Sequence, residues 1–257
     1  MLPGMNTRPR TLGTLRALPS LLLVVIGLAW MSLAYGAEPI RVLLVVGGHD
    51  FQTNQFHALF EALPDVRVRM VEHPAAHASL ASDKSEAYDV LVLYDMWQPI
   101  TDEAKANFIA RLKEGKGLVA LHHSLASYQQ WDEYARIIGG RYLLAKRVEN
   151  GVDKPASSYL HDVRVPVEIA DPNHPLTRGL SNFTIHDETY GNLDVRPDVH
   201  VLLKTKEPTS NPVIAWSTEY HSARVATIQL GHDRFAYEDP NFRRLLDQAI
   251  RWTAKRD

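Results

Sequence analysis

Residues 40–50 read Ile-Arg-Val-Leu-Leu-Val-Val-Gly-Gly-His-Asp, and this stretch decides the fold class. It begins with a near-continuous aliphatic run that ends in two glycines, which is typical of a strand buried on both faces of a parallel sheet. Residues 53–63 come next and predict a helix, because apolar side chains recur there at helical spacing. These side chains are Phe56, Leu59, Phe60 and Leu63. A strand that leads directly into a helix indicates an α/β protein.

The same alternation continues along the chain. Residues 66–71 alternate like a strand with one wetter face, and residues 88–94 and 117–121 form two further aliphatic strands. Between those two strands, Thr101 and the acidic residues after it begin a helix that runs to about residue 112. The order β-α-β-α-β predicts a doubly wound, mainly parallel sheet.

Residues 142–222 have a different pattern, with strands and no clear helices between them. The strands are expected at 163–169, 183–185, 199–203 and 213–216. A buried strand at 224–230 and a final amphipathic helix, which Asp239-Pro240 begins, follow this region. We therefore predict one domain, residues 38–257, in which a β region is added to the α/β sheet.

The first 37 residues have the features of a signal peptide. They carry arginines but no acidic side chain, then the apolar run 21–31, then the small residues 34–37. The apolar core, from about Leu18 to Leu33, is shorter than the roughly 20 residues that span a bilayer. We expect cleavage after Gly36 or Ala37, a periplasmic or secreted product, and no membrane association after cleavage.

The composition excludes several classes of function. The chain has no cysteine, so it has no thiolate nucleophile, no cysteine-bound zinc and no disulfide. The full sequence has 28 basic and 30 acidic residues, and loss of the leader's three arginines leaves a formal charge of −5. A negative domain is a poor partner for nucleic acid, so none is expected.

Ligands of open α/β sheets bind beyond the carboxyl ends of the parallel strands. The polar or aromatic residues that follow the predicted strands there are His49, Asp50, Trp97, His122, His123, His232 and Asp233. The β region adds Asp187, Glu188 and Tyr190, which directly follow a short predicted strand and can fold back over the same edge. This edge is the predicted site.

Imidazoles mixed with carboxylates suit two chemistries, acid/base catalysis near neutral pH and binding of a divalent metal such as zinc. The sequence leaves both open, and no His-Glu-x-x-His helix is present, so a metal site has to be assembled from distant loops. The candidates for both catalysis and metal binding are His49, His123, Glu188 and His232. The candidates for substrate binding are Asp50, Trp97, His122, Asp187, Tyr190 and Asp233.

Neighbouring residues on a strand point to opposite faces, so we expect at most one of His122 and His123 to face the site, and favour His123. Ser124 lacks the flanking glycines of a nucleophile elbow and is expected to cap a helix. Gly47-Gly48 lacks the third glycine of a dinucleotide site and predicts a tight turn, so no nucleotide cofactor is expected. The remaining histidines that we expect to be solvated or packed are His57, His73, His77, His200 and His221.

Several motifs, in order, resemble the ThuA-like (trehalose utilisation) family. They are Gly47-Gly48-His49-Asp50, the run 117–123, the run 173–180, Asp187-Glu188-Thr189-Tyr190 and Gly231-His232-Asp233. The resemblance covers nearly all of residues 38–257 and implies a flavodoxin-like fold, a variant of that of the class I glutamine amidotransferases. The turn that holds the amidotransferase cysteine in that fold here reads Leu121-His122-His123, which excludes amidotransferase chemistry.

The resemblance also implies a function and a partner. The family is linked to the use of trehalose and related disaccharides through 3-keto sugars, so the expected partner is a small carbohydrate. Export favours glycosides that arrive from outside the cell. We expect an enzyme that cleaves or isomerises a 3-keto-glycoside by acid/base or metal-assisted chemistry. The alternatives are a non-catalytic carbohydrate-binding or scaffold domain and a hydrolase of another small substrate.

Overall fold

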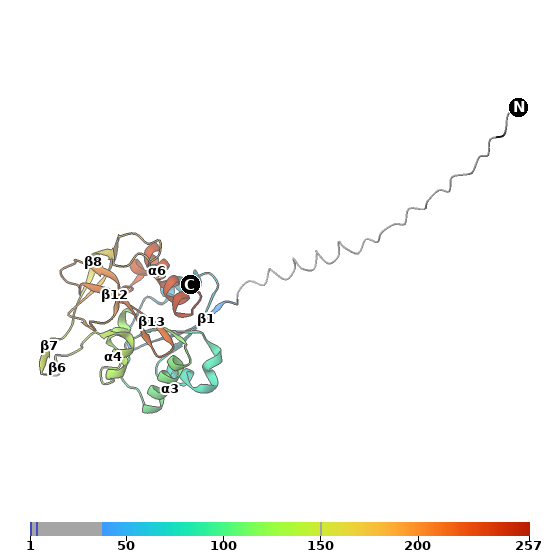
Figure 1. Cartoon of the computed structure of the whole chain (residues 1–257). Coiled ribbons are helices and arrows are strands. Elements are labelled where there is room, and N and C mark those ends of the chain that lie inside the picture. Colours follow the sequence, from blue (N-terminus) through green and yellow to red (C-terminus); the bar gives the residue numbers. More distant parts are fainter. Residues whose placement is uncertain (2–3, 5–37, 150) are drawn as a thin grey trace. The chain divides into compact units, whose positions relative to one another are not determined.

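A nine-stranded mixed sheet organises this computed structural model, which describes residues 1, 4, 38–149 and 151–257 (Figure 1). The strand order is β2-β1-β3-β4-β13-β12-β11-β8-β9. The predicted signal peptide lies, apart from residues 1 and 4, outside the described residues. Within the described part of the chain, no helix is long and apolar enough to cross a membrane.

The first five strands of this order are parallel and form the predicted doubly wound half of the sheet. They are β2 (Val66–Glu72), β1 (Ile40–Gly47), β3 (Val90–Asp95), β4 (Gly117–Leu121) and β13 (Ala223–Ile228). In chain order this is the 2-1-3-4-5 arrangement of flavodoxin-like folds. Strand β1 is buried except at Arg41, whereas the edge strand β2 alternates between exposed and half-buried residues, as the sequence predicts.

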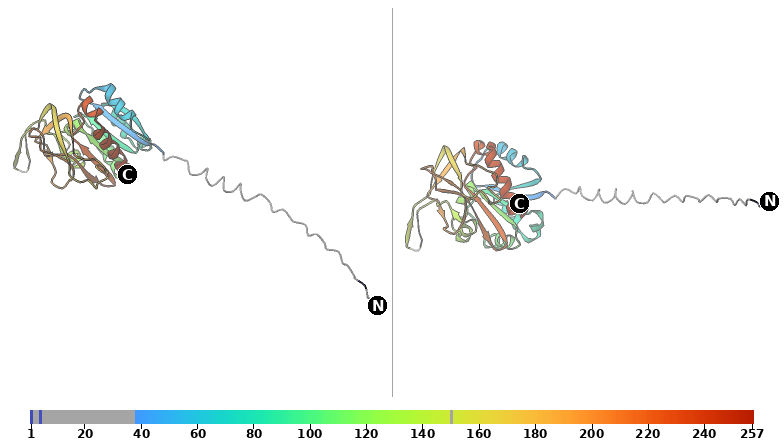
Figure 2. Two further views of the ribbon diagram at one scale, coloured as in Figure 1. Left: turned by 90° about the horizontal axis from the view of Figure 1, so that it is seen from above. Right: turned by 45° about the horizontal axis from the view of Figure 1, so that its top comes forward.

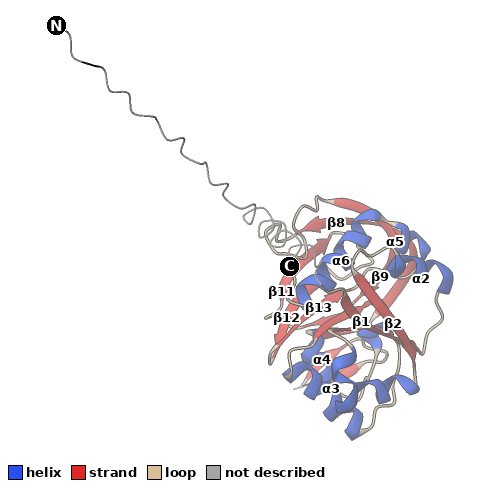
Figure 3. Cartoon of the chain, turned by 90° about the vertical axis from the view of Figure 1, so that its right-hand side faces the viewer, coloured by secondary structure: helices blue, strands red, loops and turns tan. Residues whose placement is uncertain are grey.

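Helices cover both faces of the parallel half (Figure 3). One face packs against α2 (Thr53–Glu61) and α6 (Pro240–Thr253), and the other against α3 (Asp102–Lys113) and α4 (Asp132–Ile138). Helix α6 begins as predicted, with the Asp239 carboxylate accepting hydrogen bonds from the first turn. Two compact hydrophobic cores, one on each face, therefore hold the sheet.

The remaining four strands are antiparallel and lie beside the parallel half (Figure 2). They are β12 (Val213–Tyr220), β11 (His200–Thr205), β8 (Ser158–Ile169) and β9 (Phe183–Gly191). The expected strand 183–185 is too short. Strand β9 continues through Asp187, Glu188 and Tyr190, so these residues stand on a strand rather than after one.

The other elements are short. Two small sheets pair β5 (Gly140–Arg141) with β10 (Asp194–Val195) and β6 (Arg147–Glu149) with β7 (Val152–Lys154). The short helices are η2 (Ala75–Leu80), η3 (Ser82–Ala87), η4 (His122–Ala126) and α5 (Arg234–Glu238). Ser124 lies inside η4, its hydroxyl forms no hydrogen bond with a described residue, and the expectation that it caps a helix is wrong.

Gly47-Gly48 forms the predicted tight turn after β1, with φ of 119° and 84°. A Cβ on Gly48 would lie 2.2 Å from the carbonyl oxygen of Met96, far inside van der Waals contact. The turn therefore needs glycine both for its conformation and for its close approach to the β3 edge.

Replacing Gly48 with Ala is expected to lower the free energy of unfolding by about 2–3 kcal/mol, because strain and a steric clash add. Urea unfolding followed by circular dichroism measures this. Gly151→Ala is the matched control, since Gly151 has φ of 78° but no described atom within 4 Å of the position that a Cβ would occupy. Equal losses in the two variants would show that the approach to Met96 contributes nothing.

Candidate functional site

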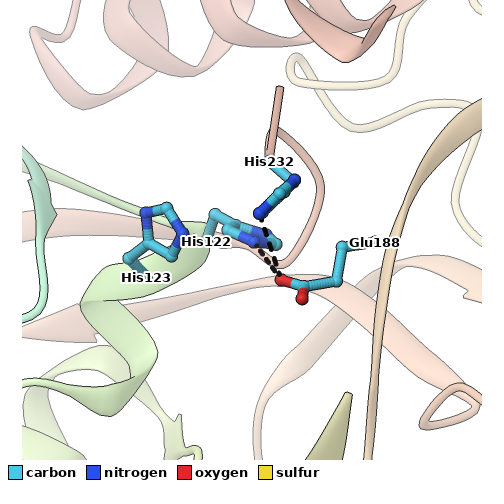
Figure 4. Close-up of side chains that lie close together, drawn as sticks. All are labelled: His122, His123, Glu188 and His232. Atoms are coloured by element: carbon cyan, nitrogen blue, oxygen red, sulfur yellow. Dashed lines mark hydrogen bonds and ion pairs between the residues drawn. The ribbon is translucent and has the colours of Figure 1, made fainter. Parts of the chain in front are cut away.

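Four side chains meet at the carboxyl edge of the parallel strands (Figure 4). His122 and His123 follow β4, His232 follows β13, and Glu188 reaches in from β9. One ligand atom from each lies within 4.8 Å of the others, a group that suits a metal ion. We call these four residues the His/Glu cluster.

Both adjacent histidines belong to the cluster, so the expectation that at most one faces the site is wrong. His122 has φ of 42° and begins the helical turn η4, so the alternation of a strand does not apply to it. The two rings lie 4.6 Å apart between centroids at an interplanar angle of 72°. Because the backbone at His122 is left-handed, the side chains of His122 and His123 both reach the same site.

His122 is fixed by hydrogen bonds at both ring nitrogens. Its Nδ1 contacts the carbonyl oxygen of Gln229, and its Nε2 lies 2.9 Å from Glu188 Oε2. A carbonyl only accepts, so Nδ1 carries a hydrogen and Nε2 is the nitrogen that faces the carboxylate. Two acceptors this close need a proton or a cation between them. Orientation of a histidine by a backbone carbonyl is typical of metal sites.

His123 provides the clearest sign that the cluster is built for a ligand. Its ring is buried, and neither Nδ1 nor Nε2 has a hydrogen-bond partner among the described residues. Burial, and then the neighbouring imidazoles, hold the pKa of His123 well below its ordinary value, so the ring is neutral. A buried imidazole without partners is costly unless a ligand engages it, and a neutral imidazole is the form that binds metals.

Glu188 is the acidic member of the cluster, and its side chain is only 5% exposed. Its Oε1 lies 3.2 Å from His161 Nδ1, and its Oε2 lies 3.9 Å from His232 Nε2. Burial raises its pKa, but the hydrogen bond from His122 and the nearby imidazoles outweigh burial, and the pKa of Glu188 lies below its ordinary value. The side chain is therefore a carboxylate at neutral pH, as metal binding requires.

Sequence reasoning missed His161. It lies in β8, two residues after Tyr159, at an irregularity of the β8–β9 pairing. Its ring centroid is 4.7 Å from that of His232, and its side chain is half exposed. Because the strand was expected to begin at residue 163, His161 fell outside it, and no local signal pointed to the site.

Asp187 supports the cluster rather than binding a ligand. It is buried, its Oδ1 accepts hydrogen bonds from the backbone N–H groups of Glu188 and His232, and its Oδ2 accepts one from Gly231. Burial raises the pKa of Asp187 to about 6, against the opposing effect of His122. Asp187 thus joins strand β9 to the loop that carries His232. The substrate-binding role expected for Asp187 has no support in this geometry.

His49 was expected to bind the metal, but the structure places His122 in the cluster instead. The His49 ring stacks on that of His123 with centroids 3.9 Å apart. Its Nδ1 lies 2.7 Å from the Asp50 carbonyl oxygen, an acceptor, so in the neutral ring Nδ1 carries the hydrogen and Nε2 is the nitrogen with the lone pair. His49 therefore offers a basic nitrogen beside the cluster.

A cavity of about 260 Å³ lies beside the cluster. It is lined by His49, Met96, His123, Ala126, Tyr142, Leu144, Tyr159, His161, Glu188 and Tyr190. Tyr190 lines this cavity, and its ring stacks on His122 with centroids 4.5 Å apart. The cavity therefore has a polar end at the cluster and aromatic walls.

The other predicted contacts lie elsewhere. Trp97 stacks on the buried ring of His73, with centroids 5.0 Å apart, and does not line the cavity. Asp233 caps α5 through the N–H of Phe235, and Asp50 lines a second cleft that adjoins the cavity at His49. Packing against His73 accounts for Trp97, and helix capping accounts for Asp233.

Burial, followed by the electrostatic effect of the nearby His122 imidazole, lowers the pKa of His232 to about 4. In metal-free protein, the unfolded chain therefore binds more protons than the folded chain between about pH 4 and 6.5, and stability falls as the pH drops through this window. We expect His232→Gln to reduce this loss by about 1–2 kcal/mol, discounted because the side chain is 20% exposed.

Urea unfolding of chelator-treated protein at pH 7 and pH 5 measures the effect. The comparison of wild type with His232→Gln isolates His232 from Asp187, whose raised pKa acts in the opposite direction. His221→Gln, a change at an exposed histidine in a turn, is the control. An unchanged pH dependence in His232→Gln contradicts the prediction.

Known proteins share this sequence pattern and fold. The family model of ThuA, described as trehalose utilisation, matches residues 41–253. Among curated proteins, none matches the sequence. The family match confirms the resemblance drawn from the ordered motifs.

Solved structures support the fold alone, since their identities to this chain are low. A ThuA-like protein from Parabacteroides merdae is 20% identical, with a TM-score of 0.69 over 84% of this chain and 90% of that chain. A ThuA-like protein from Bacteroides uniformis is 18% identical, with a TM-score of 0.62 over 85% and 93%. A GH42 β-galactosidase from G. stearothermophilus is 13% identical, with a TM-score of 0.53, and the match covers 83% of this chain and 30% of that one.

Proposed function

This chain belongs to the ThuA family, described as trehalose utilisation, and from that premise we propose that it is a metal-dependent enzyme that cleaves or isomerises 3-keto-glycosides. The observation that carries the proposal is the His/Glu cluster beside a cavity with aromatic walls. Aromatic side chains offer flat apolar faces against which a sugar ring can pack.

The cluster fits a divalent metal, zinc or a similar ion. Three imidazoles and one carboxylate are ligands that zinc accepts, and the two unpartnered nitrogens of His123 are explained if one of them binds it. His122, His123, Glu188 and His232 would hold the ion. When bound, the metal supplies Lewis acidity, which stabilises negative charge on a substrate oxygen.

The residues around the cluster can move the protons. A ketone acidifies the hydrogen on the adjacent ring carbon, and His49 Nε2, a free base at the cavity wall, is placed to take that proton. The electron pair of the broken C–H bond forms the ring double bond, and the substituent on the next carbon leaves with its bonding electrons. His161, which lines the same cavity, is placed to protonate the leaving oxygen.

Of the four catalytic candidates, Glu188 and His123 are less suited than His49 to act as the base. Both oxygens of Glu188 lie near imidazoles, and His123 is buried beneath His49. The two imidazoles that line the cavity and lie outside the cluster are His49 and His161. Because neither belongs to the proposed metal ligands, both can act on a substrate in the cavity.

The test is turnover of a 3-keto-glucoside by zinc-loaded protein, followed by the ultraviolet absorbance of the unsaturated ketone product. We expect His49→Phe to reduce kcat by about 10²–10⁴-fold, while the metal content stays the same. His57→Phe, on the exposed face of α2, is the matched control. Wild-type turnover by His49→Phe overturns the assignment of the base, and no turnover by the metal-loaded wild type overturns the proposed reaction.

A second function, carbohydrate binding without catalysis, is favoured by one observation. In the structure, Glu188 is already held by His122 and His161, as in a finished binding site. The turnover assay, combined with a measurement of sugar binding, separates the two functions. A binding domain binds the sugar but gives no product.

We also propose that the protein is exported to the periplasm or the outside of the cell, on the evidence of the basic, apolar and small-residue pattern of residues 1–37. Expression with N-terminal sequencing of the exported product tests this. A chain that begins directly after Gly36 or Ala37 is the expected result, and an intact N-terminus in the cytoplasm overturns it.

A further inference from the structure

Five exposed apolar side chains lie in one stretch of sequence, which also contributes two residues to the cavity lining. Leu144, Val148, Val152, Tyr159 and Leu160 all lie between residues 144 and 160, and each is 45% to 67% exposed. The hairpin β6–β7 in this segment extends away from the rest of the domain (Figures 1 and 2). A group of exposed apolar residues beside a site indicates contact with a ligand or partner.

Two members of this group, Leu144 and Tyr159, also line the cavity. Leu144 is 45% exposed and Tyr159 is 61% exposed, so both lie at its open side. The ring of Tyr159 is 5.3 Å from that of His161, which contacts Glu188. The exposed Tyr159 ring is therefore separated from Glu188 of the cluster by only one residue, His161.

The deeper walls of the cavity continue this apolar character. Met96 and Ala126 lack polar side-chain groups, and the hydroxyl of Tyr142 donates to the carbonyl oxygen of Ser157. Hydroxyl groups of a ligand beside Met96, Ala126 and Tyr142 would therefore find few hydrogen-bond partners.

Two amides that line the neighbouring cleft together with Leu144, those of Gln98 and Gln129, are also occupied. Gln129 donates to the carbonyl oxygen of Tyr142 and accepts from the N–H of Leu144, and Gln98 donates to the carbonyl oxygen of Ala126 and accepts from the N–H of Gln129. Both side chains brace the loops beneath the rim. A second sugar unit would lose water at its hydroxyl groups here without gaining equivalent hydrogen bonds.

We propose that the rim formed by Leu144 and Tyr159 is a subsite for an apolar aglycone, aryl or alkyl, of a glycoside whose sugar occupies the cluster end of the cavity. This inference rests on the proposed function and names its substrate class. The aglycone covers the exposed Leu144 side chain and stacks on the Tyr159 ring, so burial of apolar surface favours it over a second sugar.

The test is calorimetric binding of three stable probes to the zinc-loaded protein: phenyl β-D-glucoside, methyl β-D-glucoside and trehalose. None carries the ketone that the proposed reaction needs, so binding is measured without turnover. We expect the phenyl glucoside to bind about 10-fold more tightly than the methyl glucoside, and trehalose to bind no better than the methyl glucoside.

Variants locate the preference. Tyr159→Ala and Leu144→Ala are each expected to reduce the phenyl-to-methyl ratio to about 2–3-fold, and Tyr159→Phe to retain it. Leu160→Ala is the matched control, because Leu160 is adjacent on β8 and 49% exposed but does not line the cavity. The control is expected to keep the wild-type ratio.

The outcomes separate this inference from the proposed function. A ratio near one in the wild type, a ratio unaffected by both rim variants, or tighter binding of trehalose overturns the aglycone subsite while leaving a carbohydrate site in place. Failure of all three probes to bind also overturns the subsite, whereas the proposed function is decided separately by turnover of the 3-keto-glucoside.

Discussion

Glu188→Gln is expected to lower the affinity for zinc by about 100-fold or more. The substitution keeps the size of the side chain but removes the only negative charge of the cluster, and zinc affinity depends on deprotonated, charged ligands. The amide also disturbs His122, since its nitrogen can replace the oxygen that now lies 2.9 Å from His122 Nε2. Competition with a chelating dye gives the affinity, and elemental analysis gives the metal content.

His232→Ala is a second, independent removal of a ligand. The wild type is expected to hold close to one metal per chain, and the two variants to lose it on dialysis. Glu219→Gln in β12 is the matched control, since Glu219 is exposed and outside the cluster. Retention of metal with unchanged affinity in both Glu188→Gln and His232→Ala contradicts the metal assignment, and the site is then one of acid/base residues alone.

The parallel half of the fold could be predicted because its signals are local. The run 40–46 is buried apart from Arg41, and the strand expected at residues 117–121 is β4 (Gly117–Leu121). Hydrophobic runs, glycines and helix caps each involve only a few consecutive residues, so they can be recognised in the sequence alone.

The site was only partly predictable because its geometry depends on distant partners. Strand β9 was expected to end before Asp187, because carboxylates are rarely buried in a strand. The burial of Asp187 depends on hydrogen bonds from its neighbour Glu188 and from the distant N–H groups of Gly231 and His232. Likewise, His122 is held by the carbonyl oxygen of Gln229, more than a hundred residues away. The candidate residues gathered at the predicted edge, but which of them meet is set by tertiary contacts.

Asp187→Asn is expected to lower the free energy of unfolding by about 4 kcal/mol and the zinc affinity by about 10–100-fold. The amide oxygen can still accept from Glu188 and His232, but the amide nitrogen then faces the N–H of Gly231. Two buried donors, the Gly231 N–H and the new amide nitrogen, are then left without an acceptor, and each costs about 1–3 kcal/mol. The loop that carries His232 is released from β9, which reduces metal binding although Asp187 is not a ligand.

Urea unfolding of metal-free protein and dye competition for zinc measure the two effects separately. Asp153→Asn in β7 is the control, because Asp153 is exposed, lies in the separate β6–β7 sheet and is not a member of the cluster. A positioning role predicts that the metal affinity of Asp187→Asn falls even at low temperature, where the variant is fully folded. If zinc binds the folded variant with wild-type affinity, Asp187 contributes only to stability, and the geometry of the cluster is maintained by the hydroxyl groups of Tyr94 and Tyr237, which both contact the His232 carbonyl oxygen.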